Sequence, residues 1–224
     1  FFDIGELAGV RMEDSEVFEA LHSKVLQVVR EGLIDGLRID HPDGLANPAQ
    51  YLRRLRESGV EHVWVEKIVE PGEQLRDWPV EGTTGYDFLN DVQALFVDPA
   101  GEAALTELAG QGGDFRALAA EAKLEQTQTT FQPEVARLRA LLDVPELERS
   151  LASLPVYRTY VEPWSGRVED ADRDAIGAAG LPESLQRVLT LQESGWDAFV
   201  TRFQQTTPAI MAKGVEDTAF YRYA

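Results

Sequence analysis

Two carboxylates and one arginine stand where predicted strands end, and their types and spacing suit acid–base chemistry. Asp40 closes a short run rich in branched residues, residues 33–40, and Arg38 lies two positions before it. Glu66 closes a second such run, residues 62–66. A carboxylate beside a cation stays ionised, whereas a carboxyl in a less polar setting keeps its proton. Two carboxylates on neighbouring strands, with an arginine near the first, form a plausible acid/base constellation.

Alternation along each strand places these polar side chains on one face of the predicted sheet. Arg38 and Asp40 share a face of the first strand, and Glu66 shares a face with His62 and Trp64 in the second. The aliphatic residues between them fall on the opposite face, which we expect to pack on helices. Function in parallel α/β folds collects at the carboxyl ends of strands. A structural alternative stays open, in which Arg38 only neutralises a buried Asp40 and Glu66 caps a helix.

The elements that must position these residues alternate in type. Asp14 is a plausible N-cap for a helix that runs to Gly32, and Asn47 with Pro48 begins a second helix that ends near Gly59. Apolar residues recur at helical spacing in the first helix: Val17, Phe18, Leu21, Val25, Val28 and Val29. Helix, strand, helix, strand predicts an α/β fold with two parallel strands. Two strands need partners to make a stable sheet.

The chain changes character after the second strand. Residues 67–90 hold five Gly or Pro and predict a long loop, and residues 91–224 predict a largely helical insertion or subdomain. Helix breaks are expected at residues 110–113, at Pro133 and at residues 163–166. The expected core positions are Leu138, Leu141, Leu142, Leu147, Leu151, Leu154, Leu185, Val188, Leu189, Trp196, Phe199 and Phe203. The domains are therefore residues 1–90 and 91–224.

One acidic run resembles a metal loop without completing it. Asp170, Asp172 and Asp174 alternate like calcium ligands, but the sixth position lacks glycine and Leu181 stands where a bidentate glutamate is needed. We expect a solvated charge run there, and no metal.

Charge and composition exclude several classes of partner. The 224 residues carry 21 Lys and Arg against 39 Asp and Glu, a net charge of −18. Such an excess repels nucleic acid and anionic membranes, whereas an uncharged substrate remains compatible. The sequence holds no cysteine, which excludes thiolate chemistry and fits a reducing compartment, so we expect a cytoplasmic location. No apolar run approaches the roughly 20 residues that span a bilayer.

The two ends of the sequence are aromatic. Phe1 and Phe2 open it, and Phe220 and Tyr221 stand near its close. Because termini are usually exposed and polar, we expect these residues to be part of a longer chain.

The first strand resembles a known motif. Residues 36–41 (GLRIDH) resemble the nucleophile strand of the α-amylase superfamily of glycoside hydrolases, whose core is Gly-x-Arg-x-Asp, and Glu66 stands where that superfamily carries its general acid. Residues 35–45, 66–68, 82–87 and 211–218 together resemble the maltooligosyltrehalose synthase family, the trehalose-forming branch of that superfamily.

The resemblance implies a fold and a reaction. The fold would be part of a (β/α)₈ TIM barrel, with two central parallel strands and flanking helices, followed by the helical insertion. The enzyme would be an isomerase that converts the reducing-end α-1,4 bond of a maltooligosaccharide into an α,α-1,1 bond. Asp40 would be the nucleophile and Glu66 the acid/base. A retaining mechanism places such carboxyl groups about 5–5.5 Å apart, and Arg38 should lie in hydrogen-bonding reach of Asp40.

The resemblance also implies substrate contacts and missing parts. The residues implied to bind substrate are Arg38, His41, Asp43, Lys67, Tyr86 and Lys213. No cofactor is implied. The superfamily's Asn-His strand motif and its third catalytic Asp have no match here, so the remaining segments of the enzyme are expected partners. These 224 residues alone should be inactive.

Alternatives stay open at several positions. Many α-amylases carry Lys-His where this sequence has Asp43 and Gly44, which weakens plain hydrolysis by an α-glucanase without excluding it. His41 could be structural, Tyr86 could only pack its loop, and Lys213, in an expected loop, could be a surface residue. A non-catalytic helical interaction module is the alternative from another class. It would be favoured if Asp40 and Glu66 pointed apart.

Overall fold

The computed structural model describes residues 9–110 and 113–223, and the chain divides into two compact units. The first unit ends at Gly85, five residues before the boundary expected from the sequence. Phe1 and Phe2 lie outside the described residues, and so do the two central positions of the predicted break at 110–113. Each unit is described by itself.

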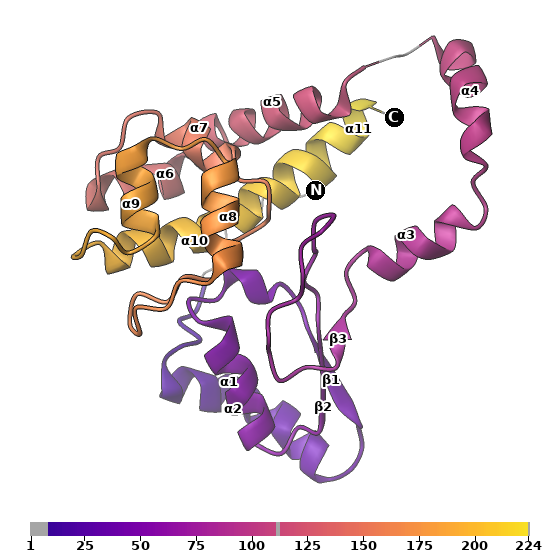
Figure 1. Cartoon of the computed structure of the whole chain (residues 1–224). Coiled ribbons are helices and arrows are strands. Elements are labelled where there is room, and N and C mark those ends of the chain that lie inside the picture. The colour runs from indigo at the N-terminus through magenta and orange to yellow at the C-terminus, as the bar shows by residue number, and fades with distance from the viewer. Residues whose placement is uncertain (1–8, 111–112, 224) are drawn as a thin grey trace. The chain divides into compact units, whose positions relative to one another are not determined.

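The first unit is a small parallel sheet with helices (Figure 1). Its elements are α1 (Ser15–Arg30), β1 (Gly36–Ile39), the 3₁₀ turn η1 (Pro42–Gly44), α2 (Pro48–Glu57), β2 (His62–Val65) and β3 (Gly82–Thr83). The strand order is β1-β2-β3, and both pairs are parallel. The sequence predicts the first two strands, but β3 lies inside the predicted loop. Because β3 is only two residues long, it cannot show an alternation of apolar and polar residues, and only its pairing with β2 defines it.

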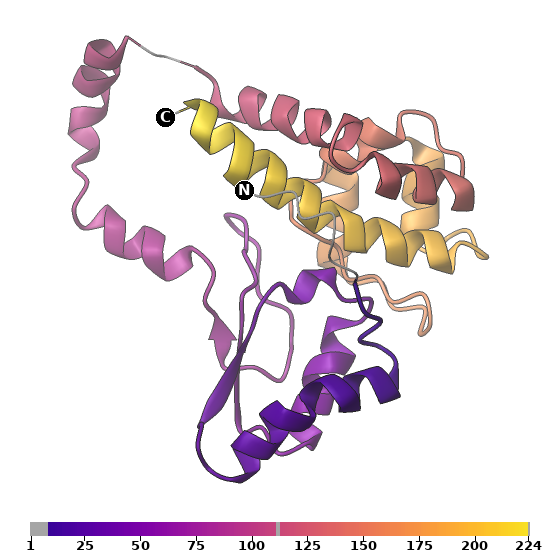
Figure 2. The ribbon, with the colours of Figure 1, turned by 180° about the vertical axis from the view of Figure 1, so that it is seen from behind.

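Both helices lie on the same side of the sheet, as Figures 1 and 2 show from opposite directions. The predicted caps are confirmed, because the Asp14 side chain accepts from the Glu16 N–H and that of Asn47 from the Gln50 N–H. Along β2 the aliphatic residues are buried and Trp64 is exposed, which is the predicted alternation. The buried face of α1 is Phe18, His22 and Leu26, whereas Leu21 and Val25, which share the helical spacing, are exposed.

The second unit is helical among its described residues, apart from loops and one isolated bridge. Its elements are α3 (Asp87–Ala94), η2 (Pro99–Gly101), α4 (Glu102–Ala109), α5 (Phe115–Gln128), α6 (Gln132–Leu141), α7 (Leu147–Ala152), α8 (Asp170–Ala178), α9 (Glu183–Leu189), α10 (Asp197–Met211), the π-helix η3 (Ala212–Ala219) and α11 (Phe220–Tyr223). Most predicted core leucines and phenylalanines are buried in one cluster, but Leu141 is exposed. α3 and α4 bury none of their side chains.

The segment after α10 differs from its prediction. The sequence predicts a loop around Lys213, but η3 continues α10 as a π-helix alongside α5 (Figures 1 and 2). Gly214 permits this approach, because a Cβ there would lie 2.7 Å from the Lys123 Cα.

The acidic run also differs from its prediction. Asp172 is fully buried, where its carboxylate accepts the N–H groups of Tyr160 and Glu169 at 2.8 and 3.1 Å and caps α8. It is therefore a structural cap and not a solvated charge. No helix in the described ranges is long and apolar enough to cross a membrane.

Candidate active site

The ends of β1 and β2 bring the two predicted catalytic carboxylates level with each other. Ile39 pairs with Val65 in the parallel register, so the next residues along the strands are Asp40 and Glu66. The ladder continues one step further, because the Glu66 N–H donates to the Ile39 carbonyl at 2.8 Å. Backbone pairing therefore fixes the relative height of both side chains.

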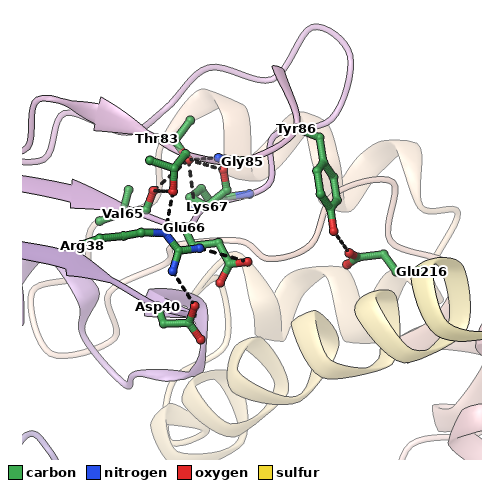
Figure 3. Close-up of polar contacts among 10 residues, drawn as sticks. Arg38, Asp40, Val65, Glu66, Lys67, Thr83, Gly85, Tyr86 and Glu216 are labelled. Atoms are coloured by element: carbon green, nitrogen blue, oxygen red, sulfur yellow. Dashed lines mark hydrogen bonds and ion pairs between the residues drawn. The ribbon is translucent and has the colours of Figure 1, made fainter. Parts of the chain in front are cut away.

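Arg38 connects three strands through one guanidinium (Figure 3). Its Nη1 lies 3.0 Å from Asp40 Oδ1, and its Nη2 lies 3.5 Å from Glu66 Oε1. Its Nε donates to Thr84 Oγ1 at 2.8 Å, just beyond β3. The predicted hydrogen bond between Arg38 and Asp40 is confirmed. Both carboxyl groups reach the same cation, so the observation that would have favoured a non-catalytic module is not found.

The environment drives the pKa values of the two carboxyl groups in opposite directions. Side-chain hydrogen bonding with Glu66, followed by the hydrogen bond and charge of Arg38, holds the pKa of Asp40 below its usual value. Burial, followed by hydrogen bonding with Asp40 and repulsion from its charge, raises the pKa of Glu66. The two carboxyl groups are therefore separated in acidity, in the direction that a nucleophile and a general acid require.

Two glycines of the motif are explained by close contacts. A Cβ on Gly36 would lie 2.7 Å from the His62 carbonyl oxygen, so a side chain there would push β1 away from β2. A Cβ on Gly44 would lie 2.8 Å from the ring of His41. His41 itself is exposed and has a left-handed backbone, with φ of 44°. Its ring folds back over η1 beside the carboxylates.

Asp43 and Lys67, which the resemblance implies to bind substrate, are buried and paired with each other. The Lys67 side chain is 1% exposed and its Nζ lies 3.7 Å from Asp43 Oδ2 and 3.1 Å from Glu73 Oε1. Lys67 also donates to the Ile68 carbonyl. The three side chains form a buried cluster that joins the segment after Asp40 to the segment after Glu66.

Thr83 is a site residue that sequence reasoning missed. Its hydroxyl donates toward the carbonyls of Val65 and Lys67, at 3.1 and 2.6 Å, and accepts the N–H groups of Lys67 and Gly85. The β-branched Thr83 and Thr84 between two glycines were the available signal for a short strand. The close packing also explains Gly85, because a Cβ there would lie 2.6 Å from the Lys67 carbonyl oxygen.

The second unit holds the other predicted substrate residues. Tyr86 is 41% exposed and donates its hydroxyl to Glu216 (Figure 3). Tyr157 donates to the other carboxylate oxygen of Glu216 at 2.7 Å. Lys213 lies 3.4 Å from Asp217, one turn along η3. Glu216 and Tyr157 were not predicted as site residues, and nothing in their spacing marks them.

No group of three or more His, Cys, Asp or Glu that could hold a metal ion occurs within residues 9–110 and 113–223.

Comparison with known proteins identifies relatives along the whole chain. No family model matches. A Mycobacterium tuberculosis protein that bears the name maltooligosyl trehalose synthase is 36% identical over 247 residues, covering 100% of this chain and 32% of the relative. The solved Arthrobacter ramosus maltooligosyltrehalose synthase is 39% identical with a TM-score of 0.78, over 31% of its length. A Sulfolobus tokodaii structure under the same enzyme name is 35% identical with a TM-score of 0.82, over 30% of its length. The chain thus spans about a third of these relatives.

Proposed function

Because the chain is homologous over its whole length to one segment of the maltooligosyl trehalose synthases, we propose that it carries that enzyme's nucleophile and acid/base residue. The observation that carries the proposal is the cluster of Asp40, Glu66 and Arg38 at the ends of neighbouring parallel strands, with the pKa of one carboxyl lowered and that of the other raised. The full-length protein would act on a maltooligosaccharide and return an isomer of it.

The proposed reaction has two displacements at one anomeric carbon. Glu66 gives its proton to the oxygen of the reducing-end α-1,4 bond while Asp40 attacks the anomeric carbon, so a covalent glycosyl–Asp40 forms and glucose is freed. Glu66, now a carboxylate, takes the proton from the anomeric hydroxyl of that glucose. The hydroxyl oxygen attacks the same carbon, Asp40 is released, and the new bond is α,α-1,1. No water is consumed, so the site must exclude water and retain the glucose.

The proposed architecture is part of a (β/α)₈ barrel. Three parallel strands with helices on one side support it, because the other face of the sheet carries Arg38 and the exposed Trp64. Parallel sheets normally have both faces covered. We propose that further strands from the remaining segments of the enzyme close the barrel over this face and supply the third catalytic Asp.

In addition to Arg38, three exposed or half-buried side chains are proposed substrate contacts, His41 in the first unit and Tyr86 and Lys213 in the second. His41 could donate to a sugar hydroxyl next to the nucleophile. Tyr86 offers an aromatic face while Glu216 holds its hydroxyl, and Lys213 offers a donor beside Asp217. Asp43 and Lys67 are better explained as supports of the site because they are buried and paired.

Product analysis of the full-length protein tests the proposed function. Incubation with maltopentaose should give a non-reducing product of unchanged mass, because the reducing end becomes part of the new bond. Release of glucose or maltose with retention of reducing ends would instead indicate the hydrolytic α-glucanase. Unchanged maltopentaose would contradict both enzyme assignments.

A further inference from the structure

Thr84 stands beside the catalytic cluster without reaching either carboxylate in any contact described above. Its backbone N–H donates to the Val65 carbonyl at 2.8 Å, and its hydroxyl lies 3.5 Å from the same oxygen. The hydroxyl oxygen accepts from Arg38 Nε at 2.8 Å. Thr84 is thus tied to the end of β2 and presents one fixed acceptor to Arg38.

A fixed acceptor for Nε determines how the Arg38 guanidinium is oriented. A guanidinium is planar and rigid, so fixing Nε sets the directions in which its two terminal nitrogens point. In Arg38 those nitrogens reach Asp40 at 3.0 Å and Glu66 at 3.5 Å. The Arg38 side chain is 48% exposed. A half-exposed arginine released from Nε would gain rotamer freedom and contact the two carboxylates for less of the time.

We propose that Thr84 is a positioning residue, whose hydroxyl orients Arg38 so that one guanidinium serves the nucleophile and the acid/base together. The inference deepens the proposed function and rests on it. Thr84 contributes no atom to the reaction, and its effect passes through Arg38.

The charges around Asp40 and Glu66 predict how the pH profile of activity should change when Arg38 is loosened. Asp40 faces Arg38, Glu66 and His41, and Glu66 faces Asp40, Arg38 and the backbone N–H of His41. Arg38 lowers the pKa of both carboxyl groups. Loosening Arg38 therefore raises both pKa values. The acid limb of the activity profile, set by Asp40, and the alkaline limb, set by Glu66, should both move to higher pH.

The test compares Thr84→Val with Thr84→Ser in the full-length protein. Valine keeps the shape and removes the hydroxyl, whereas serine keeps the hydroxyl. We expect Thr84→Val to lower kcat/KM by roughly tenfold or more, the effect of one hydrogen bond to a charged group. Both limbs of its pH profile should shift upward, while Thr84→Ser should resemble the wild type.

A double-mutant cycle with Arg38→Lys shows whether the effect passes through Arg38. Arg38→Lys alone should shift both limbs upward, and adding Thr84→Val should cause little further shift, because contacting residues do not act additively. Three results would overturn the proposal. The pH limbs could stay unmoved in Thr84→Val, Thr84→Ser could behave like Thr84→Val, or the limb shifts of Arg38→Lys and Thr84→Val could add in the double variant. Failure of the proposed function would show separately, as a wild-type protein that forms no non-reducing isomer. A hydrolytic wild type would still allow the limb shifts to test Thr84.

Discussion

At the scale of single residues, one arginine serves two carboxyl groups that must hold different charges. Arg38 lowers the pKa of both, through a hydrogen bond and its charge at Asp40 and through its charge at Glu66. The pKa of Glu66 is raised first by burial and then by the interaction with Asp40, and that same interaction is the largest cause that lowers the pKa of Asp40. Such a pair titrates as a unit, with two apparent pKa values that lie apart.

The pH profile of a Glu66→Gln variant tests this division of roles. In the wild type, kcat/KM should rise as Asp40 ionises, below the ordinary range of an aspartate, and fall as Glu66 loses its proton, above the ordinary range of a glutamate. With maltooligosaccharide the variant should lose roughly 10²–10⁴-fold in rate, because no group protonates the leaving oxygen. With a maltooligosyl fluoride, whose leaving group needs no proton, the first step should survive as a burst of fluoride release, and the alkaline limb of that step should vanish.

The control for that experiment is the wild-type protein with the same fluoride, in which the acid limb should lie at a similar pH. An alkaline limb that persists unchanged in Glu66→Gln would mean that another group controls it. The acid/base role would then belong elsewhere.

Sequence reasoning at this scale succeeded where strand periodicity applies. Arg38, Asp40 and Glu66 follow from alternation and from strand ends, and the structure places them together. Asp43 and Lys67 were expected to bind substrate, and nothing in their spacing shows that their opposite charges are buried against each other. Thr84 was missed because its role depends on register across three strands.

At the scale of elements, the sequence predicted a helix or strand correctly only where interactions between residues close in the sequence cause it. The caps at Asp14 and Asn47 are local hydrogen bonds and were predicted. β3 is defined only by its pairing with β2, and η3 is a π-helix packed along α5. Neither element therefore shows a regular hydrophobic period in the sequence. On α1, Leu21 looks as apolar as Phe18 in the sequence, but the face that tertiary packing buries excludes it.

The buried cluster of Asp43, Lys67 and Glu73 links two elements of the site and predicts a large stability effect. Lys67→Met should remove a buried cation from beside two carboxylates, one buried and one nearly so, and destabilise the protein by about 3–5 kcal/mol. Lys213→Met is the matched control, since it removes a lysine from a more exposed pair with Asp217 and should cost about 1 kcal/mol or less.

Chemical denaturation of the two full-length variants measures the difference. Equal losses in the two variants would contradict the supporting role of Lys67. A Lys67→Met protein that is as stable as the wild type but binds maltooligosaccharide poorly would restore Lys67 as a substrate contact.

At the scale of the whole molecule, the surfaces of both units suit a chain that has further segments to pack against. The sheet of the first unit is covered by helices on one side. In the second unit, α3, α4 and the turn between them leave large apolar side chains exposed, among them Phe88, Phe96 and Leu108. Where such side chains form a contiguous patch, they typically mark an interaction site. The relatives, about three times as long as this chain, agree with that interpretation.

The central claim is that Asp40 becomes covalently glycosylated, and trapping that intermediate tests it most directly. In full-length Glu66→Gln supplied with a maltooligosyl fluoride, glycosylation of Asp40 needs no acid, whereas release of the sugar lacks its base, so the intermediate should accumulate. Mass spectrometry of a protease digest should find the added sugar mass on the peptide that contains Asp40, and Asp40→Asn in the same background should abolish it. Sugar on any other peptide, an adduct that survives Asp40→Asn, or turnover of the fluoride without any adduct would contradict the account.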